Sequence, residues 1–431
     1  MTQDATVNTI SRYLGKEVRI RGWLYNMRSS GKVAFLIVRD GTGFLQAVAV
    51  RGAMPETFDG LARLTQESAI VVTGVARGDA RAPGGYEMEL RGLEVMHLAS
   101  EGYPVTHKEH GVEFLMDNRH LWLRTPRQNA LMRVRHHVVS AARNFLDSEG
   151  FVLVDSPILT PAACEGQTTL FETEYFGDKA YLSQSGQLYN EAAAMAFGRV
   201  YCFGPTFRAE KSKTRRHLVE FWMLEPEMAY CELPECMEVE ERLVTAVIQH
   251  VLVSCRHEMA VLERDTSSLE QVKPPFPRIS YDEALELLRD SGREIEWGDD
   301  FGAPDETLIS NSYEKPVFVY GFPSQCKAFY MQPHPERPDV TLSADLLAPE
   351  GIGEITGGGQ RVHDVEVLKE RIQEHGLPEA AYRWYVDLRL YGSVPHSGFG
   401  MGIERLVSWI TGTEHVRETI PFPRMINRIY P

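Results

Sequence analysis

Short runs of alternating apolar and polar residues, separated by glycines, fill the chain from Glu17 to about Ser100. The runs are EVRIRGWLYNMR, VAFLIVRD, FLQAVAV, AIVVTGVARGD and YEMELRGLEVM. Alternation with a period of two predicts half-buried strands, and five short strands at this spacing suit a small closed barrel of the oligonucleotide-binding kind. We therefore expect residues 1–100 to form a five-stranded β-barrel domain.

The pattern changes after residue 100. Residues 101–125 are polar without clear periodicity and are expected to form a hinge. Thr125 and Pro126 then predict the start of a helix that ends at Gly150. Beyond it, strand-like runs such as FVLVDSPILT, VYCFGPTF, EFWMLEPEMAY and VTLSADLLA are interrupted by helices at about 235–262, 281–291, 364–376 and 400–411. This mixture predicts one large α+β domain, 126–431, with a mostly antiparallel sheet and flanking helices.

The composition is that of an ordinary soluble globular protein. The 431 residues are 43% apolar and 24% charged, with a formal net charge of −15. No stretch approaches about eighteen uninterrupted apolar residues, and MTQDATVNTI does not resemble a secretory signal, so we expect a cytoplasmic protein with no membrane partner. The acidic balance excludes general adhesion to nucleic acid but not a partner held at discrete basic patches. Six scattered cysteines without a CxxC pair favour reduced, buried thiols over a zinc site.

One basic patch stands out in this acidic chain, in the segment FRAEKSKTRRHLVEFWMLEPE. No GxxxxGK[ST] loop is present, so any nucleotide must be held by side chains. Arg208 stands at a strand end, where it can fork onto an α-phosphate or a carboxylate, and Arg216 and His217 can reach outer phosphates. Phe221 offers a flat face to a purine. A solvated hairpin that carries surface charge remains an alternative explanation of the same residues.

Two further segments carry groups that a triphosphate needs. In GFGMGIERLVSWITG, glycines let a strand run close to a ligand, and Arg405 lies in the first turn of the helix that follows. In ADLLAPEGIGEITGGGQRVHD, Asp345 and Glu354 fall on neighbouring strands, and two such carboxylates suit Mg²⁺. Arg361 can grip a carboxylate or an amide oxygen. Helix packing and solvated acids explain each segment alone, but beside Arg208 they indicate a nucleotide site.

These three segments together resemble motifs 2 and 3 and the metal-binding strand pair of class II aminoacyl-tRNA synthetases. The helix from Pro126 and the following GFVLVDSPILTP resemble motif 1, which implies that Pro157 lies at a homodimer interface. With the barrel, the resemblance covers nearly the whole chain and points to the subgroup that charges Asp, Asn and Lys. It implies ATP, Mg²⁺ and tRNA as ligands, with Glu210 on the adenine amino group and with His217 and Arg405 on the γ-phosphate.

Within that subgroup the barrel reads the anticodon. The segment WLYNMRSSGKVAFLIVRDGTGFLQ is similar to the strands that do so. The resemblance implies that Phe35 stacks on the central uracil, that Gln46 hydrogen-bonds the edge of this base, and that Arg28 steadies the neighbouring nucleotide. Stacking plus one edge contact is how single-stranded RNA is normally read. The alternative is that Phe35 is an ordinary member of the barrel core.

The segment SQSGQLYNEAA bears on the choice of amino acid. Aspartyl enzymes carry a QSPQ-x-x-K pattern here, whose Lys pairs with the substrate carboxylate; in this chain Gly186 replaces the Pro and Asn190 the Lys. Loss of that cation favours a neutral amide substrate. RETIPFPR and CEGQTTLF also resemble asparaginyl enzymes more than aspartyl or lysyl ones. Asparaginyl enzymes usually have a small or apolar residue at the position of Asn190, which we nevertheless assign to the amino-acid site.

The resemblance assigns the remaining contacts with L-asparagine. Glu225 accepts a hydrogen bond from the side-chain NH₂ group, and Arg361 donates to the side-chain carbonyl oxygen. Gln187 and Glu165 bind the α-amino end, while Arg208 binds the α-carboxylate.

The expected reaction is attack of the asparagine carboxylate on the α-phosphorus of ATP, followed by transfer to tRNA. Arg208 and Arg405 are the expected catalytic residues, and no side chain is needed as a nucleophile. An aspartyl enzyme that also charges the asparagine tRNA is the first alternative, and a non-catalytic tRNA-binding paralogue is the second. A class I synthetase is a third, since EKSKT faintly echoes the KMSKS loop of that class, but the chain has no HIGH-like partner.

Overall fold

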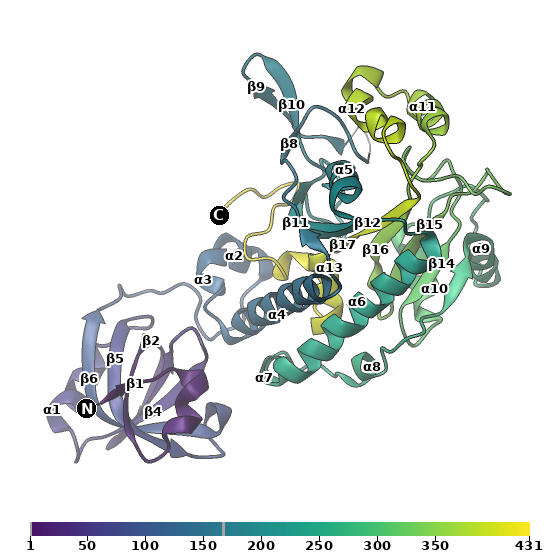
Figure 1. Cartoon of the computed structure of the whole chain (residues 1–431). Helices are drawn as coiled ribbons and strands as arrows, with labels where there is room; N and C mark the ends of the chain where they lie inside the picture. The colour runs from purple at the N-terminus through teal and green to yellow at the C-terminus, as the bar shows by residue number, and fades with distance from the viewer. Residues whose placement is uncertain (1, 166–168) are drawn as a thin grey trace. The chain divides into compact units, whose positions relative to one another are not determined.

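The computed structural model describes residues 2–165 and 169–431. Its contacts divide the chain into two compact units, one that ends at Asn129 and one that runs from Ala130 to Pro431. We describe each unit by itself (Figure 1).

The first unit is built on a closed barrel. Its strands follow the order β1-β2-β3-β4-β6-β5, and β2 also pairs with β5, which closes the sheet. The strands are β1 (Gln3–Asp4), β2 (Glu17–Ser30), β3 (Val33–Arg39), β4 (Phe44–Val50), β5 (Ala69–Gly78) and β6 (Tyr86–His97). The five-stranded barrel expected from the alternating runs is confirmed, and a two-residue strand β1 is added to it.

Short helices complete this unit. They are η1 (Val7–Tyr13), α1 (Pro55–Gly60), η2 (Leu61–Arg63), η3 (Pro83–Gly85), α2 (Val112–Asp117) and α3 (Arg119–Trp122). The last two lie in residues 101–125, the segment that we expected to form a hinge. Their lengths of six and four residues are too short for a helical period to show in the sequence.

The second unit is built on an eight-stranded sheet with the order β13-β14-β15-β16-β17-β12-β11-β7. Its central pairs are antiparallel, and only the outer pairs β13–β14 and β11–β7 are parallel. The strands are β7 (Val152–Leu153), β11 (Arg199–Phe207), β12 (Glu220–Ala229), β13 (Arg278–Ser280), β14 (Val317–Tyr320), β15 (Ser343–Ala348), β16 (Gly353–Gln360) and β17 (His396–Gly402). The predicted α+β domain with a mostly antiparallel sheet is confirmed.

Helices flank this sheet, and a small second sheet lies beside it. The helices are α4 (Pro126–Ser148), α5 (Gln187–Phe197), α6 (Leu233–Ser254), α7 (Arg256–Val261), α8 (Ser267–Glu270), α9 (Tyr281–Asp290), α10 (Ala303–Asn311), α11 (Val365–Glu374), α12 (Glu379–Leu390), α13 (Ile403–Thr411) and η5 (Val416–Glu418). The small sheet contains β8 (Leu159–Thr160), β10 (Asp178–Leu182) and β9 (Glu172–Tyr175) in that order. None of the helices in the described residues is long and apolar enough to cross a membrane.

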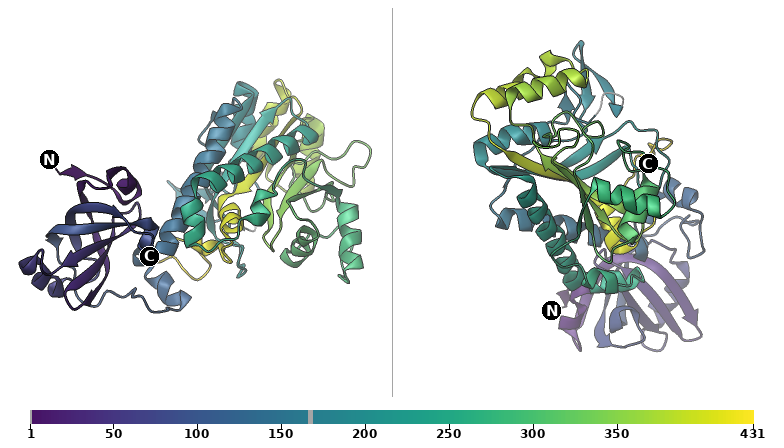
Figure 2. Two further views of the ribbon diagram at one scale, coloured as in Figure 1. Left: turned by 90° about the horizontal axis from the view of Figure 1, so that it is seen from below. Right: turned by 90° about the vertical axis from the view of Figure 1, so that its right-hand side faces the viewer.

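The two faces of the large sheet have different roles. Buried side chains of α4, α6 and α13 pack on one face in a single core cluster, which includes Leu224 of β12 and Met401 of β17. The helix α6 crosses this face and can be followed from two further sides in Figure 2. Side chains alternate along a strand. Met223 and Glu225 therefore point to the opposite face, where they line a cavity.

Candidate active site

The residues predicted to bind ATP come together in one cavity of about 90 Å³. The antiparallel pair β11–β12 and the loop between these strands bring the basic segment to this cavity, and α13 begins beside it. The residues on its wall include Arg208, Glu210, Arg216, His217, Phe221, Glu354 and Arg405. Guanidinium groups from distant parts of the chain therefore surround one cavity, as the sequence predicted.

Arg208 is available for an anion. Burial opposes its charge, yet Glu165, Glu210 and Glu354 raise the pKa of Arg208 above its usual value, so it stays a cation. Its Nε is buried and has no hydrogen-bond partner within the described residues. Its guanidinium carbon lies 5.5 Å from the ring centre of Phe221. A buried, unsatisfied N–H of a cation is costly unless an anion completes it, which suits a phosphate or carboxylate ligand.

Arg216 and His217 already have protein partners. Arg216 Nη1 donates to Glu306 Oε2 at 3.2 Å and to the carbonyl of Ala303 at 3.1 Å, so it is tied to α10. His217 Nε2 lies 3.9 Å from Glu210 Oε2. Both side chains line the cavity, but phosphate contact by Arg216 competes with its bonds to α10.

The two carboxylates predicted to bind a metal ion meet over Gly357. A Cβ atom at Gly357 would lie 2.8 Å from Glu354 Oε1 and 3.2 Å from Asp345 Oδ1, so only glycine leaves this space open. A bulge in the β15–β16 pairing falls at this point of the ladder, and bulges re-aim side chains. Lys327 Nζ donates to Asp345 Oδ2 at 2.6 Å.

The charges of the two acids differ although both are buried. Burial raises the pKa of Asp345 to about 7, against the pull of Lys327. Burial also opposes the charge of Glu354, but Arg405, Lys327 and Arg208 together lower the pKa of Glu354 below its usual value. Two carboxylates over an open glycine fit a hard divalent cation with oxygen ligands.

A second cavity of about 260 Å³ adjoins the first and shares Arg208 and Glu354 with it. It contains most of the predicted amino-acid contacts: Glu165, Gln187, Glu225 and Arg361. The metal pair Asp345 and Glu354 lies on its wall too. The residues predicted to contact nucleotide, metal and amino acid thus line two adjoining cavities on the face of the sheet that α6 does not cover.

Glu225 is held by neutral donors. Its Oε2 accepts from the Gly186 amide at 3.0 Å and from Cys202 Sγ at 3.3 Å, and the Ser185 hydroxyl donates to its Oε1. Burial raises the pKa of Glu225 above its usual value, and these donors only partly oppose the rise. It is therefore a buried carboxylate without an ion-pair partner within the described residues.

Asn190, which we expected to line the amino-acid site, lies behind it. Its side chain is fully buried, its Nδ2 donates to the backbone carbonyl of Glu225 at 2.8 Å, and its Oδ1 accepts from Ser156 Oγ at 3.3 Å. Both amide atoms are thus bonded within the protein, and Asn190 is absent from the cavity wall. Asn190 therefore positions the strand that carries Glu225 and does not reach the cavity, which corrects our assignment.

Arg361 forms an ion pair with Glu227, a residue that was not predicted from the sequence. Its Nε and Nη2 each donate to Glu227 at 3.0 Å, and both side chains are buried. Glu227 lies two residues after Glu225 on β12, so both acids point to the cavity face. The alternation of EPE along a predicted strand was the signal that could have found it.

The sequence reading also missed Lys327, Glu191 and His396. Lys327 follows no motif, and its Nζ lies 3.8 Å from the ring centre of Phe322 as well as beside Asp345. Glu191 follows Gln187 by four residues, which is one helical turn, but no helix was predicted for this segment. Nothing in the sequence near His396 indicates that it faces Glu191.

In the barrel, the predicted anticodon residues lie on one outer face. Arg28 of β2 stands opposite Phe35 of β3, and its guanidinium carbon lies 4.8 Å from the centre of the Phe35 ring. Gln46 of β4 donates to Glu87 Oε2 at 3.2 Å. The β3 residues in the barrel core are Ala34, Leu36 and Val38. Phe35 is therefore not a core residue, and its side chain is half-buried.

Comparisons with known proteins agree with this geometry. Residues 111–426 match the family of tRNA synthetases class II (D, K and N), and residues 18–96 match the OB-fold nucleic acid binding domain. An asparagine–tRNA ligase from Desulforamulus reducens is 60% identical over 427 residues, which cover 98% of this chain and 99% of the relative.

Solved structures give the same picture. The asparaginyl-tRNA synthetase from Pyrococcus horikoshii, complexed with asparaginyl-adenylate, has a TM-score of 0.95 and 45% identity, and all of both chains is covered. The aspartyl-tRNA synthetase from Entamoeba histolytica has a TM-score of 0.84 and 27% identity, with 100% of this chain and 93% of that chain covered. The chain belongs to the class II tRNA synthetases of the D, K and N group.

Proposed function

We propose that the chain is an asparagine–tRNA ligase, which activates L-asparagine with ATP and transfers it to the asparagine tRNA. The observation that carries this choice is the pair Arg361 and Glu225 in one cavity. A side-chain amide needs a donor for its oxygen and an acceptor for its NH₂ group, and the pair offers one of each. An aspartate would place a second carboxylate against Glu225, which has no cation to share.

The first step is an in-line displacement at the α-phosphorus. A carboxylate oxygen of asparagine forms a bond to phosphorus as the bond to the bridging oxygen of pyrophosphate breaks, and asparaginyl-adenylate and pyrophosphate result. Arg208, whose Nε lacks a partner, neutralises charge on the α-phosphate and the carboxylate. Arg405 holds the departing phosphates, and Phe221 supports the adenine. Alignment and charge carry the rate, without a nucleophilic side chain.

The metal pair fits this step. Asp345 and Glu354 would hold Mg²⁺ over Gly357, where a Cβ atom has no room. The ion would supply positive charge to the phosphate oxygens. In this structure Lys327 pairs with Asp345, and Arg405 pairs with Glu354 Oε2 at 3.0 Å.

In the second step a terminal ribose hydroxyl of the tRNA attacks the activated carbonyl, and AMP leaves. The barrel would recognise the anticodon through Phe35, Gln46 and Arg28. Glu87 can only accept, so it fixes the amide nitrogen of Gln46 and leaves the carbonyl oxygen for a base edge.

A homodimer and a cytoplasmic location are part of the proposal. The dimer is supported by the likeness to motif 1 and by β7, an edge strand of the large sheet. The apolar residues Val152, Leu153, Ile158 and Leu159 in this region are each 38–46% exposed. Six free cysteines, five of them buried, support a reducing compartment. The mass of the protein in solution tests the dimer.

ATP–pyrophosphate exchange with each of the twenty amino acids tests the activity. We expect exchange with asparagine and little with aspartate. Activity with aspartate alone would make the chain an aspartyl enzyme, equal activity with both would make it non-discriminating, and tRNA binding without ATP consumption would make it a non-catalytic paralogue. Arg208→Ala should abolish exchange and leave the fold intact. Arg242→Ala, which removes a half-exposed arginine paired with Glu149, is the matched control.

A further inference from the structure

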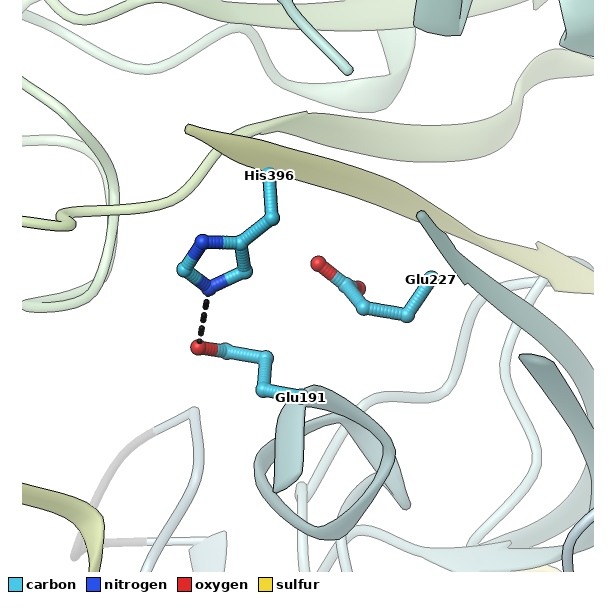
Figure 3. A group of neighbouring side chains, drawn as sticks. All are labelled: Glu191, Glu227 and His396. Carbon is cyan, nitrogen blue, oxygen red and sulfur yellow. Dashed lines mark hydrogen bonds and ion pairs between the residues drawn. The ribbon is translucent and has the colours of Figure 1, made fainter. Parts of the chain in front are cut away.

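A closed network of ions lies behind the amino-acid cavity. Glu191 of α5, Glu227 of β12 and His396 of β17 place one ligand-type atom each within 4.8 Å of one another, and all three side chains are buried (Figure 3). Two arginines complete the group: Arg389 of α12 donates to Glu191 Oε2 at 2.6 Å, and Arg361 donates to Glu227.

The geometry of this group resembles a metal site, but its chemistry does not. A metal ion needs lone pairs that point to the centre. The lone pairs of Glu227 are taken by two N–H groups of Arg361, and those of Glu191 by Arg389, Tyr385 and His396. The two guanidinium groups already supply the positive charge that a metal ion would bring. Protein groups therefore already occupy the space and supply the charge that a metal ion would need.

His396 lies between two hydrogen-bond acceptors in this network. Its Nδ1 lies 2.8 Å from the carbonyl oxygen of Val394, and its Nε2 lies 2.9 Å from Glu191 Oε2. A carbonyl and a carboxylate only accept, so each ring nitrogen faces an acceptor. Burial opposes the charge of Glu191, but Arg389 and His396 lower the pKa of Glu191 below its usual value, and it is an anion.

The charge of Glu191 fixes the side chain of Gln187 one helical turn earlier. Gln187 Nε2 donates to Glu191 Oε1 at 3.0 Å. Because a carboxylate cannot donate, the amide of Gln187 must turn its nitrogen to Glu191 and its oxygen away. Gln187 lines the cavity, and its Oε1 has no hydrogen-bond partner in the part of the chain that the structure describes. Gln187 therefore presents its carbonyl oxygen to the cavity, and not its NH₂ group.

We infer that Glu191 is a positioning residue for asparagine: it orients Gln187 so that the amide oxygen of Gln187 accepts a hydrogen bond from the substrate's α-ammonium group. This rests on the proposed function, in which Gln187 binds the α-amino end. The anion itself is locked from the other side by Arg389, Tyr385 and His396, so it cannot turn or take a proton to release Gln187. Without this anion, Gln187 is free to present its NH₂ group, which repels an ammonium.

The test uses Glu191→Gln and two ligands that differ only in the α-amino group. Succinamate is asparagine without this group. We measure the KM for asparagine in ATP–pyrophosphate exchange and the inhibition constant of succinamate as a competitor. In Glu191→Gln the KM for asparagine should rise at least about tenfold, the size of one hydrogen bond to a charged group, while succinamate binding and kcat change little. A merely structural role would weaken both ligands together, and that result overturns the inference.

Two further variants locate the effect. In a Gln187→Ala background, Glu191→Gln should no longer change the ratio of the two constants, because its action passes through Gln187. A full effect in that background contradicts the inference. Glu241→Gln, which makes the same change at a buried acid that accepts from the Phe276 amide away from the cavity, is the control and should leave the ratio as it is.

Misfolding of the variant and failure of the proposed function can each be distinguished from failure of the inference. If Glu191→Gln does not fold, Glu191→Asp keeps the charge beside Arg389 and His396 but withdraws it from Gln187 by about one methylene, and the ratio must shift in the same direction. An unchanged ratio in folded Glu191→Asp overturns the inference. If the unaltered protein shows no exchange with asparagine, the proposed function has failed, which is a different result from an unchanged ratio in an active enzyme.

Discussion

The buried ion pair of Arg361 and Glu227 allows a prediction in which stability and activity respond differently to the same substitutions. The two side chains are each 2% exposed and joined by two hydrogen bonds of 3.0 Å. Arg361→Met removes the cation and leaves Glu227 as a buried, unpaired acid. Breaking one side of a buried ion pair costs about 3–5 kcal/mol.

The expected fall in melting temperature follows from the size of the unit. The second unit spans about 300 residues, and an unfolding entropy of about 2.1 cal/mol/K per residue gives about 0.6 kcal/mol/K for it. A loss of about 3–5 kcal/mol then lowers the melting temperature by about 5–8 °C. The double variant Arg361→Met, Glu227→Met replaces both ions by apolar groups and should recover most of this loss.

Activity should not recover with stability. The double variant has no donor for the substrate's amide oxygen, so its kcat/KM for asparagine in pyrophosphate exchange should stay at least about tenfold below normal. Calorimetry and exchange assays on the two variants measure both quantities. A single variant as stable as the original protein, or a double variant no more stable than the single one, would refute the description of a buried ion pair. Full activity in the double variant would refute the role of Arg361.

Three other measurements test separate parts of the structure. Burial raises the pKa of Glu225, so as pH falls Glu225 takes up a proton at a higher pH than an ordinary glutamate and can then donate to a carboxylate. The ratio of kcat/KM for aspartate to kcat/KM for asparagine should therefore rise with falling pH. In Glu225→Gln this ratio should not change with pH. Phe35→Leu should raise the KM for tRNA by about 5- to 150-fold in aminoacylation, the loss of one stacked base, and an effect on pyrophosphate exchange would contradict a role confined to the anticodon. Burial raises the pKa of Glu240 well above its usual value, so the folded chain keeps a proton that the unfolded chain loses, and stability falls as pH rises through this range. Glu240→Gln can still accept from Thr356. The melting temperature of this variant minus that of the original protein should therefore be larger at about pH 8 than at about pH 5, and an equal difference at both pH values would disprove this.

Local patterns in the sequence predicted the parts of the site that are themselves local. Arg208 and Phe221 could be placed because a strand, a basic loop and a returning strand lie next to one another in the chain. Asp345 and Glu354 could be placed on neighbouring strands because only a short glycine-containing turn separates their segments. The barrel strands could be placed because alternation is strict when one face is buried.

The rest depended on contacts between distant segments. Asn190 was assigned to the cavity because a cation stands at its position in related enzymes, but a shorter amide finds its partners in the backbone of Glu225 and in Ser156. His396 lies 205 residues from Glu191 in sequence, and no local pattern links them. The helix α5 was missed because its residues QLYNEAAAMAF form no clear polar and apolar faces, being packed on several sides.

Glu354 and Glu225 show how one residue type serves opposite ends of the same cavity. Burial disfavours the charge of both. Three cations, Arg405, Lys327 and Arg208, outweigh burial at Glu354 and lower its pKa. Within residues 2–165 and 169–431, Glu225 accepts hydrogen bonds from a hydroxyl, an amide and a thiol, and its pKa is raised. The nucleotide end can therefore accept further negative charge from phosphates. At the proposed side-chain end the one cation, Arg361, is already paired with Glu227, so an added carboxylate would face Glu225 without a free counter-charge in the described residues. Selection of a neutral side chain thus follows from where the cations of the site are placed, more than from the shape of the pocket.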